Sequence, residues 1–135
     1  MKKILLILSI GLIANFSNAT GTKDWEHKNI SKAVFALEVV DRVPQNIISE
    51  VDTDTNKIYF YTNLRNLTNQ KLKHRWIFNN KNMAEVEFNP KSDRWRVYSS
   101  KNLWRGWTGV WRVEVVDEND IVILTKSFIY NKKIN

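Results

Sequence analysis

The chain has 135 residues, of which 43% are hydrophobic and 26% are charged, and its formal net charge is +7 at pH 7. It contains no cysteine, which excludes disulfide bonds, thiol chemistry and attachment to a membrane through a lipidated cysteine. Its length is typical of one domain that is stabilised by its own packed core.

The first 19 residues have the pattern of a secretory signal peptide. Met1–Lys3 is a short positive segment, Ile4–Ala14 is an apolar run, and Ser17 and Ala19 are small residues at the −3 and −1 positions of a cleavage site. An uncleaved membrane anchor is the alternative, but a span requires about 20 apolar residues. We therefore predict cleavage after Ala19 and export to the periplasm or the extracellular space.

The exported part is predicted to be basic and to begin with a short leader. Removing the first 19 of 135 residues leaves 116, and the loss of Lys2 and Lys3 lowers the charge from +7 to +5. Residues 20–32 are polar without periodicity, so we interpret them as a flexible leader. A basic surface favours anionic partners. The lysines and arginines are dispersed along the sequence, however, and this pattern is usual for charges that only keep a protein soluble.

From residue 33 onward, short segments alternate between apolar and polar residues, which is typical of β-strands. The expected strands are Ala33–Arg42, Lys57–Leu64, Gln70–Phe78, a segment with Ala84, Val86 and Phe88, Asp93–Tyr98, a segment with Trp111, Val113 and Val115, and Ile121–Tyr130. The expected turns, where asparagine and aspartate tolerate left-handed backbone conformations, are Asn66–Asn69, Asn79–Asn82 and Asp117–Asp120.

About seven closely spaced strands without an amphipathic helix predict an all-β fold. We expect an antiparallel β-sandwich of immunoglobulin-like architecture over residues 33–130, followed by a polar tail, residues 131–135.

No group of residues in the sequence forms a recognisable catalytic or metal-binding motif. Two separate histidines do not make a zinc site, and no nucleophile-elbow pattern surrounds the serines. We therefore expect neither an enzyme nor a bound metal or cofactor. A hydrolase is the less favoured alternative, and it would require His74 to lie in an open pocket beside Ser99, Ser100 or a carboxylate. His74 shares a strand face with Leu72 and Trp76, so a hydrogen-bonded core histidine is the simpler interpretation, and a functional role is the alternative.

The tryptophans divide into two groups. Trp95 and Trp111 lie on the inward faces of their strands and are expected in the core. Trp104 and Trp107 lie in a loop that contains glycine, with Arg105 between them. These three residues could form a surface that stacks on sugar rings and captures anionic groups. The alternative is a loop folded over one end of the sandwich, with both indoles half-buried.

Three ordered motifs carry a family resemblance: His74-Arg75-Trp76, Arg94-Trp95-Arg96-Val97-x-Ser99-Ser100-Lys101, and Gly109-x-Trp111-Arg112-Val113-x-Val115. Together with Asp41-Arg42-x-Pro44 and Tyr59-Phe60-x-Thr62, they resemble the bacterial domain-of-unknown-function family DUF2914 from about Ala36 to Tyr130. The resemblance implies one compact, β-rich domain of envelope-associated proteins, without an established activity or catalytic residues. The Trp104–Trp107 loop departs from the motifs.

The resemblance makes a set of polar residues candidates for a shared site: His74, Arg75, Arg94, Arg96, Ser99, Ser100 and Lys101. If the strands that carry these arginines pair, the arginines line one sheet face and end at a Ser-Ser-Lys loop suited to an anion. The alternative is a structural hydrogen-bond network that fixes the turn after Tyr98.

These residues, together with Trp104, Arg105 and Trp107, lead us to expect a noncatalytic domain that binds a glycan or an anionic envelope polymer. A subunit or assembly factor that binds another envelope protein is the alternative. We expect no nucleic-acid partner, and no membrane span after cleavage.

Overall fold

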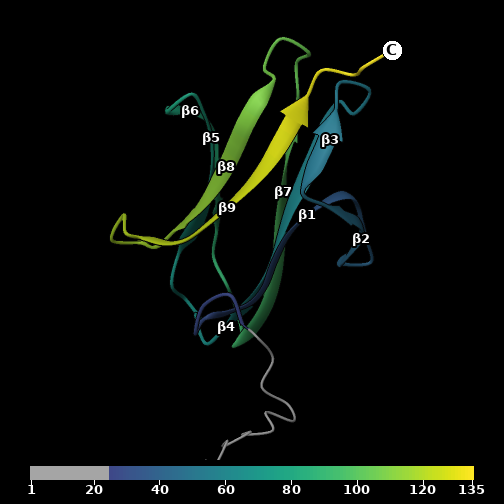
Figure 1. Ribbon diagram of the computed structural model, residues 1–135. Helices are drawn as coiled ribbons and strands as arrows, with labels where there is room; N and C mark the ends of the chain where they lie inside the picture. Colours follow the sequence, from purple (N-terminus) through teal and green to yellow (C-terminus); the bar gives the residue numbers. More distant parts are fainter. Residues whose placement is uncertain (1–24) are drawn as a thin grey trace, which may run out of the picture.

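The computed structural model describes residues 25–135, so the predicted signal peptide and the first part of the leader lie outside the described residues. The described chain forms nine strands (Figure 1): β1 Ile30–Val40, β2 Val43–Ile48, β3 Glu50–Asp52, β4 Lys57–Arg65, β5 Leu72–Phe78, β6 Lys81–Phe88, β7 Arg94–Asn102, β8 Gly109–Val116 and β9 Val122–Asn131. Within residues 25–135, no helix is long and apolar enough to cross a membrane.

The strands form two sheets that pack face to face. The first, here the β1 sheet, has the order β2-β1-β4-β7, and the second, here the β5 sheet, has the order β3-β9-β8-β5-β6. Of the seven predicted strands, the first, second and fifth lie in one sheet and the other four in the second sheet, as in immunoglobulin-like sandwiches. The predicted all-β sandwich is therefore confirmed.

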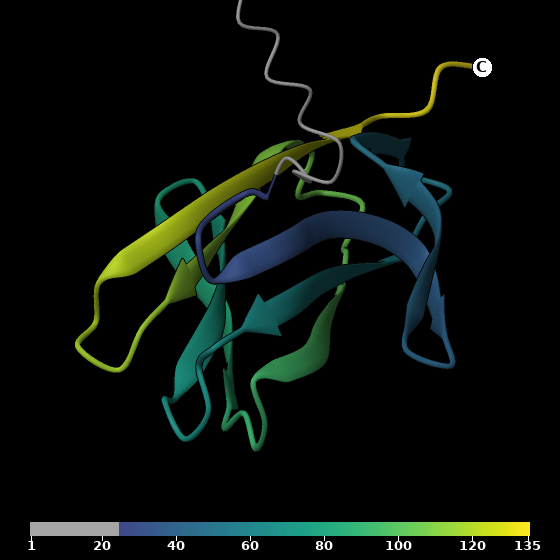
Figure 2. The same cartoon turned by 90° about the horizontal axis from the view of Figure 1, so that it is seen from below.

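Two short strands, β2 and β3, were not predicted. Asp41 and Arg42 have φ angles of 50° and 60°, which is the left-handed pair that a two-residue hairpin turn requires. The chain therefore folds back at this turn, and Figure 2 shows β1 curving toward the hairpin that it forms with β2. Pro44 is tolerated because β2 is an edge strand. β3 pairs in parallel with β9, so the sandwich is not wholly antiparallel.

Two strand boundaries also differ from the prediction. β1 begins at Ile30, inside the segment interpreted as a leader, and Ile30 is fully buried in the core. β7 continues to Asn102, so Ser99, Ser100 and Lys101 belong to a strand. The prediction of a Ser-Ser-Lys loop was wrong, because the backbone of these polar residues stays paired with β4.

Aromatic rings from both sheets fill the space between them. Phe35 of β1 lies with its ring centroid 4.8 Å from that of Phe128 of β9, and Trp111 of β8 stacks on Phe128 at 6.1 Å. Trp76 and Trp111 are fully buried, as the alternation predicts, whereas Trp95 is partly buried against the same cluster. Rings of this size bury roughly 150–250 Å² each and dominate the stability of such a core.

Candidate functional site

His74 lies at the centre of a polar network inside the sandwich. Its Nδ1 is 2.8 Å from Oγ of Ser99 and its Nε2 is 3.0 Å from Oγ1 of Thr62, while the Trp76 indole N–H donates to Oγ of Ser99. The network thus joins β5 of one sheet to β4 and β7 of the other. Every buried side-chain polar atom of residues 25–135 has a hydrogen-bond partner, so burying these polar groups leaves none of them unpaired.

The network does not have the properties of a catalytic site. A serine next to a histidine is the geometry of an activated nucleophile, but His74 is 1% exposed and Ser99 is 5% exposed. Burial lowers the pKa of His74 from 6.5 to about 3. Among the residues that the structure describes, no carboxylate is hydrogen-bonded to its ring to stabilise an imidazolium. Within residues 25–135, no cluster of three or more metal-ligating side chains occurs. The interpretation of His74 as a core histidine is therefore confirmed.

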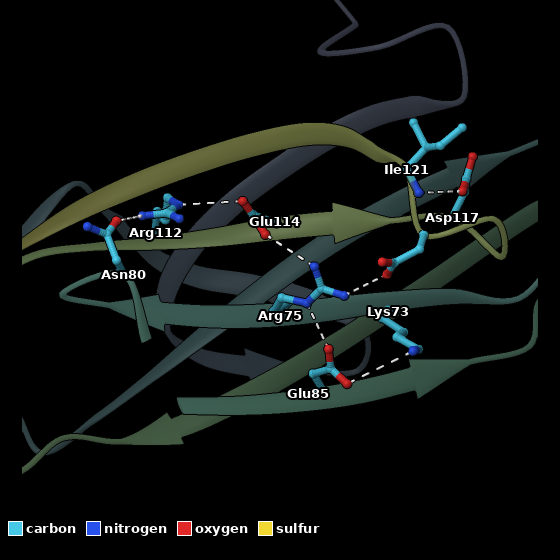
Figure 3. Close-up of polar contacts among 9 residues, drawn as sticks. Lys73, Arg75, Asn80, Glu85, Arg112, Glu114, Asp117 and Ile121 are labelled. Carbon is cyan, nitrogen blue, oxygen red and sulfur yellow. Dashed lines mark hydrogen bonds and ion pairs between the residues drawn. The ribbon is translucent and has the colours of Figure 1, made fainter. Parts of the chain in front are cut away.

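Arg75 points to the opposite, solvent side of β5, where three carboxylates surround its guanidinium (Figure 3). Its Nε is 2.7 Å from Glu85 of β6, its Nη2 is 2.8 Å from Asp120, and its Nη1 is 3.6 Å from Glu114 of β8. These contacts raise the pKa of Arg75, and the bond from Arg75 lowers the pKa of Glu85. The outer face of the β5 sheet is thus neutralised by its own ion pairs.

The arginines predicted to form one anion site lie on opposite sides of the molecule. Arg75 belongs to β5 in one sheet, whereas Arg94 and Arg96 belong to β7 in the other. The condition for a shared face, that these two strands pair, is not met, because β7 pairs with β4 and β5 pairs with β6 and β8. Ser99 is also not part of an exposed anion site, since its side chain points inward to His74.

Arg94 and Arg96 instead gather with other cations on the outer face of the β1 sheet. The register of the strands places Arg94 directly opposite Arg65 of β4, and it places Arg96 opposite Asn63, which is itself opposite Lys32 of β1. Side chains directly opposite one another in antiparallel strands share a face. We call this surface the basic face and define it by Lys32, Arg65, Arg94, Arg96, Tyr98 and Ser100.

The cations of the basic face are not neutralised. Arg65 donates to the amide oxygen of Asn63 at 2.7 Å, and Arg96 donates to the backbone carbonyl of Arg42 at 3.3 Å. In the described part of the chain, no carboxylate lies within 4.0 Å of a charged atom of Arg65, Arg94 or Arg96. Arginines directly opposite one another repel, so this arrangement opposes folding.

The pKa of Tyr61 is affected by the same positive charges. Its phenol lies on this side of β4, where burial raises its pKa, and the charges of Arg96, Arg94 and Arg65 oppose that shift. Beside it, Tyr98 of β7 is 44% exposed and its ring centroid is 6.1 Å from that of Tyr59. An open aromatic ring therefore adjoins the arginine cluster.

The loop between β7 and β8 places its two indoles differently. Trp104 is 63% exposed, whereas Trp107 packs against the core, 6.0 Å from Trp111, and accepts the Trp111 indole N–H on its carbonyl oxygen. Lys101 lies with Nζ 5.1 Å from the centroid of the Trp107 ring. Only Trp104 offers an open surface, and Arg105 next to it pairs with Asp54 at 3.8 Å.

Three residues of the basic face were not predicted as site residues: Lys32, Arg65 and Tyr98. Period-2 alternation places Tyr98 on the same side of its strand as Arg94 and Arg96, and this signal was available in the sequence. Lys32 and Arg65 join the site only through the pairing of β1, β4 and β7, which no local pattern reveals.

A comparison with known families bears on the same segment. The sequence profile of a family described as protein of unknown function (DUF2914) matches residues 69–129. This match supports the resemblance to the DUF2914 family over these residues. The DUF2914 segment runs from just before β5 to the end region of β9, and it contains every predicted site residue. The part of the resemblance that precedes residue 69 lies outside the match. No curated protein matches the chain.

Proposed function

We propose that this protein is an exported, noncatalytic domain that binds an acidic polysaccharide of the cell envelope on its basic face. The observation that carries the proposal is the facing pair Arg65–Arg94, with Arg96 beside it and, among residues 25–135, no carboxylate within 4.0 Å of the three. Residues that oppose folding and remain on an open surface are typical of a surface that serves a ligand.

The contrast between the two sheets supports this assignment. The outer face of the β5 sheet surrounds its central arginine with three carboxylates, whereas the outer face of the β1 sheet leaves its arginines for an external anion. A planar guanidinium can hold a carboxylate or a sulfate through two parallel hydrogen bonds.

The geometry favours a polymer with regularly spaced charges and sugar rings. Arg94 and Arg96 are two residues apart on one strand, so their side chains emerge roughly 7 Å apart on the same side. Tyr98 continues the row with an exposed ring that can stack on the apolar face of a sugar, and Ser100 adds a hydroxyl. Two neighbouring anionic groups and then a sugar ring would lie along β7.

A binding measurement on two double variants tests the proposal. Arg94→Gln/Arg96→Gln removes two charges from the basic face, and Lys71→Gln/Lys81→Gln removes two exposed charges elsewhere as the matched control. With polygalacturonate as the probe, we expect the first variant to lose at least tenfold in affinity and the control to lose less than twofold. Binding of neutral dextran with equal affinity, or equal loss in both variants, would contradict the proposal.

A protein partner is the second candidate, and it is favoured by one observation. The β1–β2 hairpin exposes Val40, Val43 and Ile47 next to the unpaired edge of β2. Exposed apolar side chains beside a free edge can accept a strand from another chain. Crosslinking from Ile47→Cys in cells that captures one envelope protein, with no effect of Arg94→Gln/Arg96→Gln, would favour this candidate over the polysaccharide.

A further inference from the structure

A second polar site lies at the end of the sandwich where the β3–β4 loop, the β7–β8 loop and the C-terminal tail come together (Figure 1). These three segments line an open hollow of about 520 Å³. Its lining includes Thr53, Asp54, Arg105, Thr108, Lys132 and Lys133. The volume is within the range of small-molecule sites, roughly 300–1,000 Å³.

The hollow has an excess of positive charge. Asp54 is shared between two cations, since its carboxylate is 3.8 Å from Nη2 of Arg105 and also accepts a hydrogen bond from Nζ of Lys133. Lys132 has no carboxylate within 4.0 Å among residues 25–135. Among the lining side chains, three cations share the carboxylate of Asp54, and the charge of Asp52 also acts on Lys133. Lys132 is the cation that an external anionic group could bind.

Arg105, whose side chain is 73% exposed, is directed toward Thr53 and Asp54. Arg105 donates from Nε to the backbone carbonyl of Thr53 at 3.4 Å, and the backbone N–H of Lys133 donates to Oγ1 of the same threonine at 3.1 Å. Thr53 thus links the loop to the tail. An arginine that is oriented before a ligand arrives loses less side-chain entropy on binding.

The same loop carries an aromatic surface. Trp104 precedes Arg105, and its indole lies over Gly106, where an added Cβ would come within 2.2 Å of the ring. The ring also meets Trp107 edge-on, with the centroids 5.8 Å apart. These contacts hold Trp104 at the surface, 63% exposed. Trp104 does not line the hollow, but it is the neighbour in sequence of Arg105, which does.

We propose that this hollow is a binding site for one or two sugar units that carry a carboxylate or a phosphate. Arg105 and Lys132 bind the anionic group, the hydroxyl of Thr108 binds a sugar hydroxyl, and Trp104, next to Arg105 in the loop, stacks on a second ring outside the hollow. The site is separate from the arginines of the basic face, because the loop follows the end of β7 at Asn102, about 20 Å along the strand from Arg96 at 3.3 Å per residue. Ser100, at the other end of the basic face, is the member of that face nearest in sequence to the loop.

The test is a titration of ¹⁵N-labelled protein followed by NMR, with glucuronate and glucose 6-phosphate as the two anionic probes and glucose as the neutral control. The indole N–H signal of Trp104 is assigned by its loss in Trp104→Phe. We expect this signal to move with at least one anionic probe and not with glucose. The stronger of the two probes identifies the anion as a carboxylate or a phosphate.

Two double variants locate the binding. Arg105→Gln/Lys132→Gln should weaken the binding of the anionic probe at least fivefold, and Lys71→Gln/Lys81→Gln, with the same change of charge, should weaken it less than twofold. A Trp104 signal that moves equally with glucose, that moves with no probe, or that responds alike in both variants would overturn the proposal.

The basic face is tested separately from the hollow. Arg94→Gln/Arg96→Gln should bind the small anionic probes with wild-type affinity, although it loses polygalacturonate. Loss of the small probes in this variant would overturn the assignment of an independent hollow, whereas failure of polygalacturonate binding alone would contradict only the basic face.

Discussion

Replacing His74 by glutamine should remove a large part of the dependence of stability on pH. In the folded protein, burial lowers the pKa of His74 from 6.5 to about 3, and the imidazole makes its two hydrogen bonds to Ser99 and Thr62 as a neutral ring. In the unfolded chain, the same ring takes up a proton below about pH 6.5. The unfolded state therefore binds more protons, and the folded state loses stability as the pH falls.

The size of the effect follows from the lowered pKa. The contribution of His74 is constant above pH 6.5 and is lost at about 1.4 kcal/mol per pH unit as the pH falls toward 3. Between pH 6.5 and pH 4.5, the free energy of unfolding of the wild type should thus fall by roughly 2–3 kcal/mol more than that of His74→Gln. This is a large fraction of the stability of a typical domain, about 5–15 kcal/mol.

Urea denaturation at pH 7.5, 6.0, 5.0 and 4.5, followed by tryptophan fluorescence, measures this difference. Glutamine keeps a donor and an acceptor but does not titrate, so the variant should be less stable at pH 7.5 and should approach or overtake the wild type near pH 4.5. The carboxylates, including Glu85 with its lowered pKa, titrate in both proteins and cancel in the comparison. Parallel curves for the two proteins would refute a buried, neutral His74.

Three further substitutions test the two sheet faces and the β7–β8 loop. Arg94→Glu should raise the free energy of unfolding by about 0.5 kcal/mol, because it turns the repulsive pair with Arg65 into an attractive one, while polygalacturonate binding is lost; urea denaturation and calorimetric titration check the two effects. Arg75→Gln leaves three carboxylates without their shared partner and should lower stability by about 1–2 kcal/mol, less in 1 M salt; unchanged urea midpoints would contradict the network. Gly106→Ala should displace the Trp104 ring, seen as a shifted indole N–H signal with the core signals unchanged.

The alternation of residues along each strand was sufficient to predict most of the fold. Trp111, Val113 and Val115 point inward as expected and are fully buried. The β1–β2 hairpin was missed because Asp41 and Arg42 do not carry the usual Asn-Gly turn signal and because Pro44 is a strand breaker in every position except an edge. β3 has only three residues, too few for a periodic signal.

The candidate site was harder to predict, because alternation tells which residues share a face of one strand but not which strands become neighbours. Arg75 and Arg94 stand in similar Arg-Trp motifs, yet they lie in different sheets and have opposite electrostatic surroundings. No local sequence pattern marks Arg65 as a site residue. It becomes a candidate only because the strand register places it opposite Arg94. Ser99 was assigned to a loop because it precedes two polar residues. In the structure its side chain points inward and forms a hydrogen bond with His74.

The most direct test of the basic face is to map where an acidic oligosaccharide binds. In ¹⁵N-labelled protein titrated with a galacturonate hexamer, the backbone signals of Arg94, Arg96 and Tyr98 should move, and those of Arg75 and Glu85 on the opposite sheet should stay in place. Shifts concentrated around Arg75 and Glu85, or no shifts at all along β7, would contradict binding on the basic face.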